Sequence, residues 1–104
     1  MTKYGAKRTE VDGTWFASRR EAERYKELRL LEAGGVISEL ELQPRFPLTV
    51  NGKKICVYVA DFRYLDNETG EVTIEDVKGV RTDVFKLKAK LLDAVHGITV
   101  REIR

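Results

Sequence analysis

Apolar residues recur at helical spacing in two stretches of the chain. In residues 18–33 the pattern begins after Ser18, a favourable N-cap, and stops at Gly34. In residues 82–96 it begins after Thr82 and stops before another glycine. The sequence therefore predicts two helices. Their apolar faces are expected to hold Ala17, Tyr25, Leu28 and Leu31 in the first helix, and Val84, Leu87, Leu91 and Ala94 or Val95 in the second.

Four further stretches are typical of strands. Residues 36–50 are extended but contain two prolines, which remove ladder donors and indicate an edge or irregular strand. Residues 54–65 and 71–78 are rich in β-branched and aromatic residues and flank a turn, so they predict a hairpin. Residues 98–103 follow the second helix. A right-handed crossover would place them parallel to the strand 71–78.

The order of these elements indicates one α/β (α+β) domain. Helix, three strands, helix and strand give an α-β-β-β-α-β order, with a mixed sheet flanked by helices, over residues 1–104. Residues 1–17 are expected to form a basic N-terminal arm, with a turn at Asp12-Gly13 that favours a short hairpin.

The composition narrows the possible chemistry. The 104 residues include 19 Lys and Arg against 17 Asp and Glu, for a net charge of +2, so any polyanion-binding surface must come from spatial sorting of charges. One Cys and one His exclude a disulfide framework and a Cys/His zinc site. We find no apolar run that approaches a membrane span and no signal-peptide pattern, so we expect no membrane partner and a cytoplasmic location.

The predicted hairpin brings acidic residues together. If its strands pair symmetrically about the turn, Asp61 lies opposite Asp76 and Val59 lies opposite Lys78. Two opposed carboxylates are destabilising unless a cation compensates them, and oxygen ligands suit Mg²⁺ or Mn²⁺. The alternative to a metal site is that Asp76 and Lys78 form only a cross-strand salt network. Glu75 points to the other face on this register, and we interpret it as a solvated neighbour.

Glu21 supplies a third candidate acid. It lies within the apolar stripe of the first helix, so it faces whatever that helix covers. If the helix packs across the hairpin, Glu21 approaches Asp61 and Asp76. Three carboxylates and a lysine around one or two metal ions form a site for phosphodiester hydrolysis. Ser18 and Glu21 also have capping-box spacing, and both roles stay open.

These acids form a pattern that resembles a nuclease family. Asp61 followed by Asp76-Val77-Lys78, with Glu21 upstream, is similar to the PD-(D/E)XK nuclease motif. Further segments resemble a phage- and prophage-encoded family of predicted nucleases, long treated as a domain of unknown function. They are Tyr4-Gly5-Ala6-Lys7, Val11-Asp12-Gly13, Phe16, Ser18-Arg19-Arg20-Glu21-Ala22, Leu42-Gln43-Pro44-Arg45-Phe46, Ala60-Asp61-Phe62 and Glu75-Asp76-Val77-Lys78-Gly79.

The resemblance implies a restriction-endonuclease-like core and specific residue roles. Asp61 and Asp76 would bind metal together with the carbonyl of Val77, Glu21 would bind a second metal or a metal-bound water, and Lys78 would serve the nucleophile. The implied cofactor is Mg²⁺ or Mn²⁺. Ala60 stands where the motif has proline, and Asp76 stands where glutamate is commoner.

The resemblance also implies a nucleic-acid substrate. Relatives in this superfamily include resolvases of Holliday junctions, so duplex or branched DNA is the expected partner, in a bacterial host cell. One site in 104 residues implies a homodimer for cutting both strands. The candidate DNA-binding residues are Lys7, Arg8, Arg19, Arg20, Gln43, Lys86 and Lys88.

Two other functions are compatible with the sequence. The first is a non-catalytic nucleic-acid-binding module on the same scaffold, in which the basic residues bind phosphate and the acids serve no metal. The second is a small interaction protein whose carboxylates form only salt bridges, with lysines that simply cover a solvated helix face.

Overall fold

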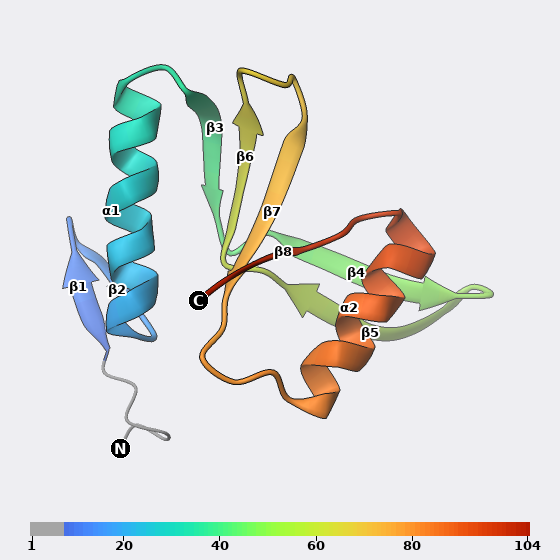
Figure 1. The fold of residues 1–104 in the computed structure, drawn as a ribbon. Helices are drawn as coiled ribbons and strands as arrows, with labels where there is room; N and C mark the ends of the chain where they lie inside the picture. Colours follow the sequence, from blue (N-terminus) through green and yellow to red (C-terminus); the bar gives the residue numbers. More distant parts are fainter. Residues whose placement is uncertain (1–7) are drawn as a thin grey trace.

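The chain folds around one mixed sheet and two helices. The structure is a computed structural model that describes residues 8–104 (Figure 1). The part of the predicted basic arm before residue 8, with Lys7, lies outside the described residues. The rest of the arm forms the expected hairpin of β1 (Thr9–Val11) and β2 (Thr14–Phe16). No helix in the described part of the chain is long and apolar enough to cross a membrane.

Both predicted helices are confirmed at their capping residues. Helix α1 spans Arg19–Ala33, and the Ser18 hydroxyl accepts from the Glu21 amide at 3.1 Å. Helix α2 spans Asp83–His96, and the Thr82 hydroxyl accepts from the Phe85 amide at 3.1 Å. Gly97 closes α2 in the left-handed conformation, which a glycine adopts without steric cost.

The central sheet has four strands in the order β3-β6-β7-β8. Strands β3, β6 and β7 are antiparallel neighbours, and β8 is parallel to β7 as the crossover argument predicted. Their bounds are Ile37–Leu42 for β3, Phe62–Asp66 for β6, Val72–Val77 for β7 and Arg101–Ile103 for β8. The result is a mixed α+β fold.

Two of the predicted strands are each divided into two. Strands β4 (Arg45–Val50) and β5 (Lys53–Val59) form a separate hairpin, so Val59 pairs with Arg45 and its predicted pairing with Lys78 is wrong. The break follows from local geometry. Gln43 has a φ of 51°, and Pro44 has no N–H to continue the β3–β6 ladder.

The register predicted for the central hairpin is confirmed where the ladder exists. The β6–β7 ladder pairs Phe62 with Glu75 and Leu65 with Val72, which is the symmetric register that the sequence predicts. Asp61 immediately precedes Phe62 in the chain, and Asp76 immediately follows Glu75. The two acids are therefore at the same end of the hairpin.

The central sheet separates two apolar cores. On one side α1 packs its buried residues against the sheet, around Leu28 and Phe62. On the other side α2 packs over the β4–β5 hairpin, around Leu48 and Leu92. This division places α1 and α2 on different sides of the sheet, as Figure 1 also shows.

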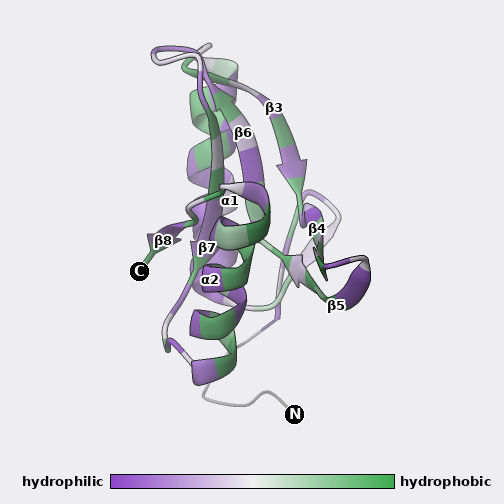
Figure 2. Cartoon of the chain, turned by 90° about the vertical axis from the view of Figure 1, so that its right-hand side faces the viewer, coloured by the Kyte–Doolittle hydropathy of each residue, from purple (hydrophilic) through white to green (hydrophobic). Residues whose placement is uncertain are grey.

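The apolar face predicted for α2 is confirmed at Leu91 and Val95, which pack against the second core, and is wrong at Val84 and Leu87. Phe85 and Leu92 are its buried residues, whereas Val84 is 64% exposed and Leu87 is 60% exposed. Apolar and polar residues alternate around this helix (Figure 2), so the sequence pattern alone does not determine which face packs against the core. Phe85 and Leu92 are seven residues apart and lie on one face, which the β4–β5 hairpin selects.

Candidate active site

The four residues of the predicted site come from separate elements. Glu21 lies in the first turn of α1, and Asp61 lies in the bend between β5 and β6. Asp76 lies near the end of β7, and Lys78 follows that strand. Glu21 and Asp76 are buried, and Asp61 and Lys78 are partly buried. Only tertiary contacts can therefore bring the four side chains together.

The bend that carries Asp61 is hydrogen-bonded to β7. Its carboxylate Oδ2 accepts from the Val77 amide at 2.7 Å, and its own amide donates to the Glu75 carbonyl at 3.0 Å. The Gln43 amide donates to the Asp61 carbonyl at 3.0 Å. The corner between the two hairpins thus holds one Asp61 oxygen in place beside the Asp76-Val77-Lys78 segment.

Glu21 reaches the same corner from α1. Burial, followed by the negative charge of Asp61, raises the pKa of the Glu21 carboxyl, so the two carboxyl groups lie within electrostatic range of each other. Two carboxylates at this range repel each other, which disfavours ionisation of both groups at once. The prediction that the first helix brings Glu21 toward the hairpin acids is confirmed for Asp61.

Asp76 has one satisfied and one unsatisfied oxygen. Its side chain is 1% exposed, and its Oδ2 accepts a hydrogen bond from the Tyr58 hydroxyl. Its Oδ1 is buried without a hydrogen-bond partner in the described residues. The Lys78 ammonium lies 3.9 Å from this Oδ1, which is an ion pair and not a hydrogen bond. A buried carboxylate oxygen in this state is costly unless a further donor or cation engages it.

Lys78 is the electrostatic neighbour that all three acids share. Its charge favours the ionised forms of Glu21, Asp61 and Asp76, and so lowers the pKa of each carboxyl. Its ammonium also lies 4.6 Å from the centre of the Phe85 ring. The structure thus brings the three predicted acids around the one predicted lysine.

Burial outweighs the lysine for each acid. Desolvation, followed by the charge of Asp61, raises the pKa of Glu21 to about 7. Desolvation raises the pKa of Asp76 to about 6 and also raises the pKa of Asp61. Carboxyl pKa values raised in this way are common where acid–base or metal chemistry takes place, and they also occur in structural networks.

These raised pKa values predict that the metal-free protein loses stability as pH rises. The folded state keeps protons on Glu21 and Asp76 up to about pH 7 and 6, whereas unfolded acids release theirs near pH 4. The folded state therefore binds more protons in this interval, and the unfolding free energy falls as pH increases. We expect chemical denaturation to give a higher value at pH 5 than at pH 8.

Two neutral substitutions provide the control for this pH dependence. Combining Glu21→Gln with Asp76→Asn should reduce the difference between pH 5 and pH 8, because both titrating groups are removed. An unchanged difference in the double variant would contradict the assignment.

A hollow opens beside Asp76 and Lys78. It has a volume of about 250 Å³ and lies between β5 and the start of α2. Lys88 also lines it, and its ammonium lies 3.4 Å from the Val57 carbonyl. The other lining residues include Tyr58, Thr82, Val84 and Phe85. The hollow therefore offers two cations beside a buried carboxylate.

The donor set fits a hard divalent cation in its chemistry. Asp61, Asp76 and Glu21 supply carboxylate oxygens, and Asp76 Oδ1 is an oxygen without another partner. Across residues 8–104, however, no three Asp, Glu, His or Cys side chains form a group that could hold a metal ion as they stand. Val77 is engaged through its amide, and the metal-binding role predicted for its carbonyl stays a prediction.

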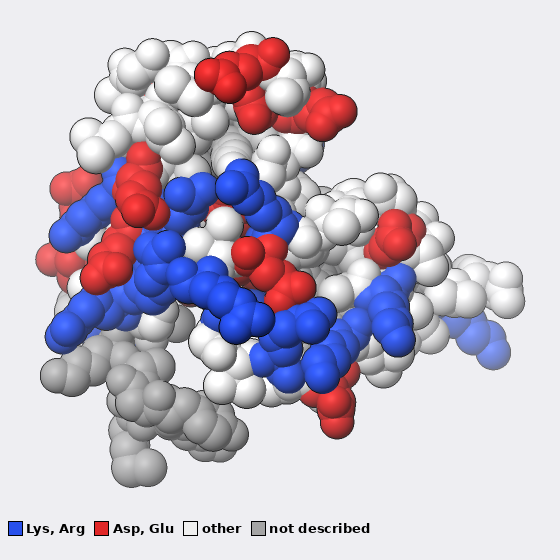
Figure 3. All heavy atoms as spheres, viewed as in Figure 1, with Lys and Arg blue, Asp and Glu red and all other residues white. Residues whose placement is uncertain are grey.

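The predicted DNA-binding residues are spread over several elements. Arg8 lies 5.2 Å from the Trp15 ring, while Arg19 is exposed on α1. Arg20 pairs with Glu23 and Glu27 and donates to the Arg104 carbonyl. On the face seen in Figure 3, Lys and Arg side chains form a row from α1 toward α2.

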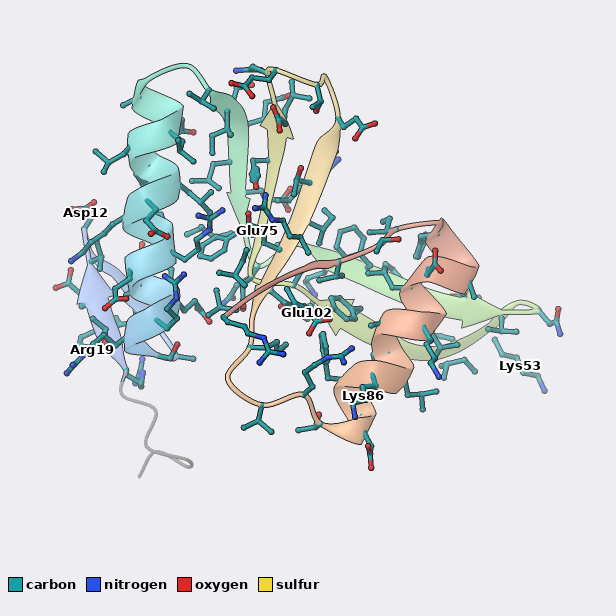
Figure 4. All side chains as sticks on the ribbon, viewed as in Figure 1. Asp12, Arg19, Lys53, Glu75, Lys86 and Glu102 are labelled. Atoms are coloured by element: carbon teal, nitrogen blue, oxygen red, sulfur yellow. The ribbon has the colours of Figure 1, made fainter. Side chains whose placement is uncertain are left out.

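The two lysines predicted on α2 do not share a site. Lys88 lines the hollow beside Asp76, whereas Lys86 lines a second hollow of about 460 Å³ between α2 and β8. Glu102 also lines this second hollow, and Figure 4 labels both Lys86 and Glu102. Gln43 is exposed at the corner that holds Asp61. Lys88 therefore lies in the hollow that Asp76 lines, and Gln43 contacts Asp61 through its backbone amide.

The interpretation of Glu75 as a solvated neighbour is wrong. Its side chain is 0% exposed and lies between α1 and the sheet, as Figure 4 shows. Arg24 donates to it through two nitrogens at 2.8 and 2.7 Å, and the Tyr64 hydroxyl donates at 2.5 Å. Glu75 does point to the opposite face from Asp76, as predicted. Arg24 lies one turn after Glu21, and that spacing is the signal that could have indicated its inward position.

Comparison with known proteins adds a family but no activity. A family model described as "Protein of unknown function (DUF1064)" matches residues 1–102. Neither the search of curated proteins nor the search of solved structures found a match. The matched range includes all four residues of the candidate site and nearly the whole chain. The chain therefore belongs to the DUF1064 family.

Proposed function

We propose that this protein is a metal-dependent endonuclease that hydrolyses DNA phosphodiester bonds at Glu21, Asp61, Asp76 and Lys78. One observation carries the proposal. Three carboxyl groups with raised pKa values surround a single lysine, and a buried oxygen of Asp76 has no hydrogen-bond partner in the described residues. Such an arrangement is costly to a fold and is typical of a site that binds a cation.

The topology supports the same proposal. Without the β1–β2 and β4–β5 hairpins, the remaining elements α1, β3, β6, β7, α2 and β8 have a helix, three strands, helix, strand order, which supports the proposal of a restriction-endonuclease-like core. The β4–β5 hairpin is then an insertion between the first and second core strands. It supplies Tyr58 to the site and one wall of the hollow.

Each residue has a role that its contacts allow. Asp61, Asp76 and Glu21 would hold Mg²⁺ or Mn²⁺, which lowers the pKa of a bound water and neutralises charge on the phosphate. The Lys78 ammonium can orient the attacking water or stabilise the negative charge that develops on the phosphate oxygens. Before a metal ion binds, Glu21 has a pKa of about 7, so it would release its proton near neutral pH when it becomes a ligand.

The substrate and the assembly are part of the proposal. Lys78 and Lys88 in the hollow, and the row of Lys and Arg across α1 and α2, suit the phosphates of duplex or branched DNA. A single site per 104 residues cuts one strand at a time. Concerted cutting of both strands would require a homodimer.

Cleavage assays on a panel of substrates test this function. Purified protein should cut duplex or branched DNA with Mg²⁺ or Mn²⁺, and EDTA should stop the reaction. Lys78→Met should abolish cleavage while weakening DNA binding by no more than the loss of one phosphate contact. Absence of metal-dependent cleavage across plasmid, linear, flapped and four-way-junction DNA would overturn the proposal.

Lys88→Ala should weaken DNA binding through the loss of one phosphate contact. The slope of log K against log salt should fall in magnitude by about one, because one fewer counterion is released. Lys53→Ala is the matched control, since Lys53 lies on the β4–β5 hairpin away from α1 (Figure 4). Fluorescence anisotropy over a salt series measures both slopes. Equal slopes for the two variants would remove Lys88 from the DNA-binding surface.

A non-catalytic nucleic-acid-binding module is the second candidate. It is favoured by the finding that the side chains of residues 8–104 form no three-residue metal-binding group as they stand. This alternative predicts DNA binding that is insensitive to EDTA and to Asp61→Asn. The endonuclease proposal predicts that Asp61→Asn removes metal binding.

A further inference from the structure

Two acids of the candidate site each have one oxygen held by the protein. Tyr58 donates its hydroxyl to Asp76 Oδ2, and the Val77 amide donates to Asp61 Oδ2 at 2.7 Å. Asp76 Oδ1 stays without a hydrogen-bond partner among the described residues. Oδ1 of Asp76 is therefore available as a metal ligand, whereas Oδ2 is already hydrogen-bonded.

The tyrosine that holds Asp76 is itself held firmly. Tyr58 is 3% exposed, and its ring lies 6.4 Å from that of Phe85 in the core under α2. It pairs with Phe46 in the β4–β5 ladder, so its backbone is also fixed. A buried ring in this setting cannot turn its hydroxyl toward solvent without disturbing the core. The hydrogen bond to Asp76 is thus a built feature of the fold.

The number of oxygens that a carboxylate offers affects which cation it suits. Mg²⁺ requires near-octahedral geometry and is usually bound through one or two carboxylates with several waters. Ca²⁺ takes six to eight oxygens and accepts bidentate carboxylates readily. A carboxylate with one oxygen bonded to a hydroxyl is poorly available as a bidentate ligand.

We propose that Tyr58 is a positioning residue that makes Asp76 a one-oxygen ligand, and that the site consequently favours Mg²⁺ and Mn²⁺ over Ca²⁺. This inference rests on the proposed function, because it concerns the same metal site. It goes beyond that function by naming a residue outside the acids and lysine and by assigning it a role in cation selectivity.

A pair of tyrosine substitutions tests the role. Tyr58→Phe removes the hydroxyl that bonds Asp76, and Tyr64→Phe removes a hydroxyl that bonds Glu75 on the other face of β7. Both tyrosines are buried, and both variants lose one hydrogen bond to a buried acid. Mn²⁺ affinity is measured by calorimetry or by electron paramagnetic resonance of free Mn²⁺, and Mg²⁺ and Ca²⁺ compete in the same assay.

The two variants should differ clearly. Tyr58→Phe should weaken Mn²⁺ binding by about tenfold or more, as is typical for loss of a hydrogen bond to a metal ligand. It should also improve the ability of Ca²⁺, relative to Mg²⁺, to displace Mn²⁺. Tyr64→Phe should leave both quantities within about threefold of the parent protein, well below that typical loss. Equal effects of the two substitutions would overturn the role of Tyr58.

The parent protein provides a test that needs no variant. Mg²⁺ should displace Mn²⁺ at a lower concentration than Ca²⁺ does, and the reverse order would overturn the selectivity. The failure of the two proposals can be told apart. No specific Mn²⁺ binding by the parent protein would refute the metal site itself. Binding without a difference between the tyrosine variants would refute only this inference.

Discussion

Asp76→Ala should lower the rate of metal-dependent DNA cleavage by on the order of a thousandfold. The substitution removes the only buried carboxylate oxygen in the described residues that lacks a hydrogen bond, and with it the proposed metal contact. Stabilisation of transition-state charge by a metal is worth several kcal/mol, and each 1.36 kcal/mol is a tenfold change in rate. Initial rates on the best DNA substrate, with Mg²⁺ and with Mn²⁺, measure the effect.

Two further substitutions separate catalysis from folding. Asp76→Asn keeps the shape of the side chain and removes a charge whose burial is unfavourable, so it should abolish cleavage without lowering the unfolding free energy at pH 8. Asp93→Ala removes an exposed acid of α2 and should leave cleavage unchanged. Full activity in Asp76→Asn would contradict the metal-binding role of Asp76.

Arg24→Ala should destabilise the protein by about 3–5 kcal/mol, which is the usual effect of removing one partner of a buried ion pair. The guanidinium makes two hydrogen bonds to Glu75, which is fully buried and has no other cation within salt-bridge distance in residues 8–104. The hydrogen bonds to Glu75, and then its charge, raise the pKa of Arg24 further above its ordinary value. For a domain of this size the melting temperature should fall by more than about 10 °C.

Arg29→Ala is the matched control for this loss of stability. Arg29 pairs with Glu32 on the exposed side of the same helix at 2.8 Å. Exposed pairs of this kind contribute about 1 kcal/mol or less. Denaturant unfolding of the two variants should therefore differ by more than about 2 kcal/mol, which follows from the same two ranges. Similar unfolding free energies would show that the Glu75 pair contributes little.

The Arg24–Glu75 pair also connects stability with the candidate site. Arg24 lies one turn after Glu21 on α1, and Glu75 directly precedes Asp76 on β7. The pair consequently holds the helix that carries one acid against the strand that carries another. We expect that part of any loss of cleavage in Arg24→Ala reflects a misplaced Glu21.

The sequence by itself determined the elements whose signals are local. Ser18 and Thr82 mark the starts of the helices because their hydroxyls bond to amides three residues later. The β6–β7 register follows from the turn and the strand pattern, which depend on neighbouring residues. These same signals placed Asp61 and Asp76 at one end of a hairpin and Glu21 on the inner face of a helix.

Tertiary structure alone decided the features that depend on distant partners. Pro44 indicates an irregular strand, but only the meeting of two hairpins places the corner at Gln43 and Asp61. Helix α2 has apolar residues on more than one side, and only packing on the β4–β5 hairpin selects Phe85 and Leu92. Glu75 is buried because Arg24, 51 positions away in the chain, neutralises it. A charged side chain is buried only where an oppositely charged partner compensates it. Residues that are far apart in the sequence become such partners only when the chain folds.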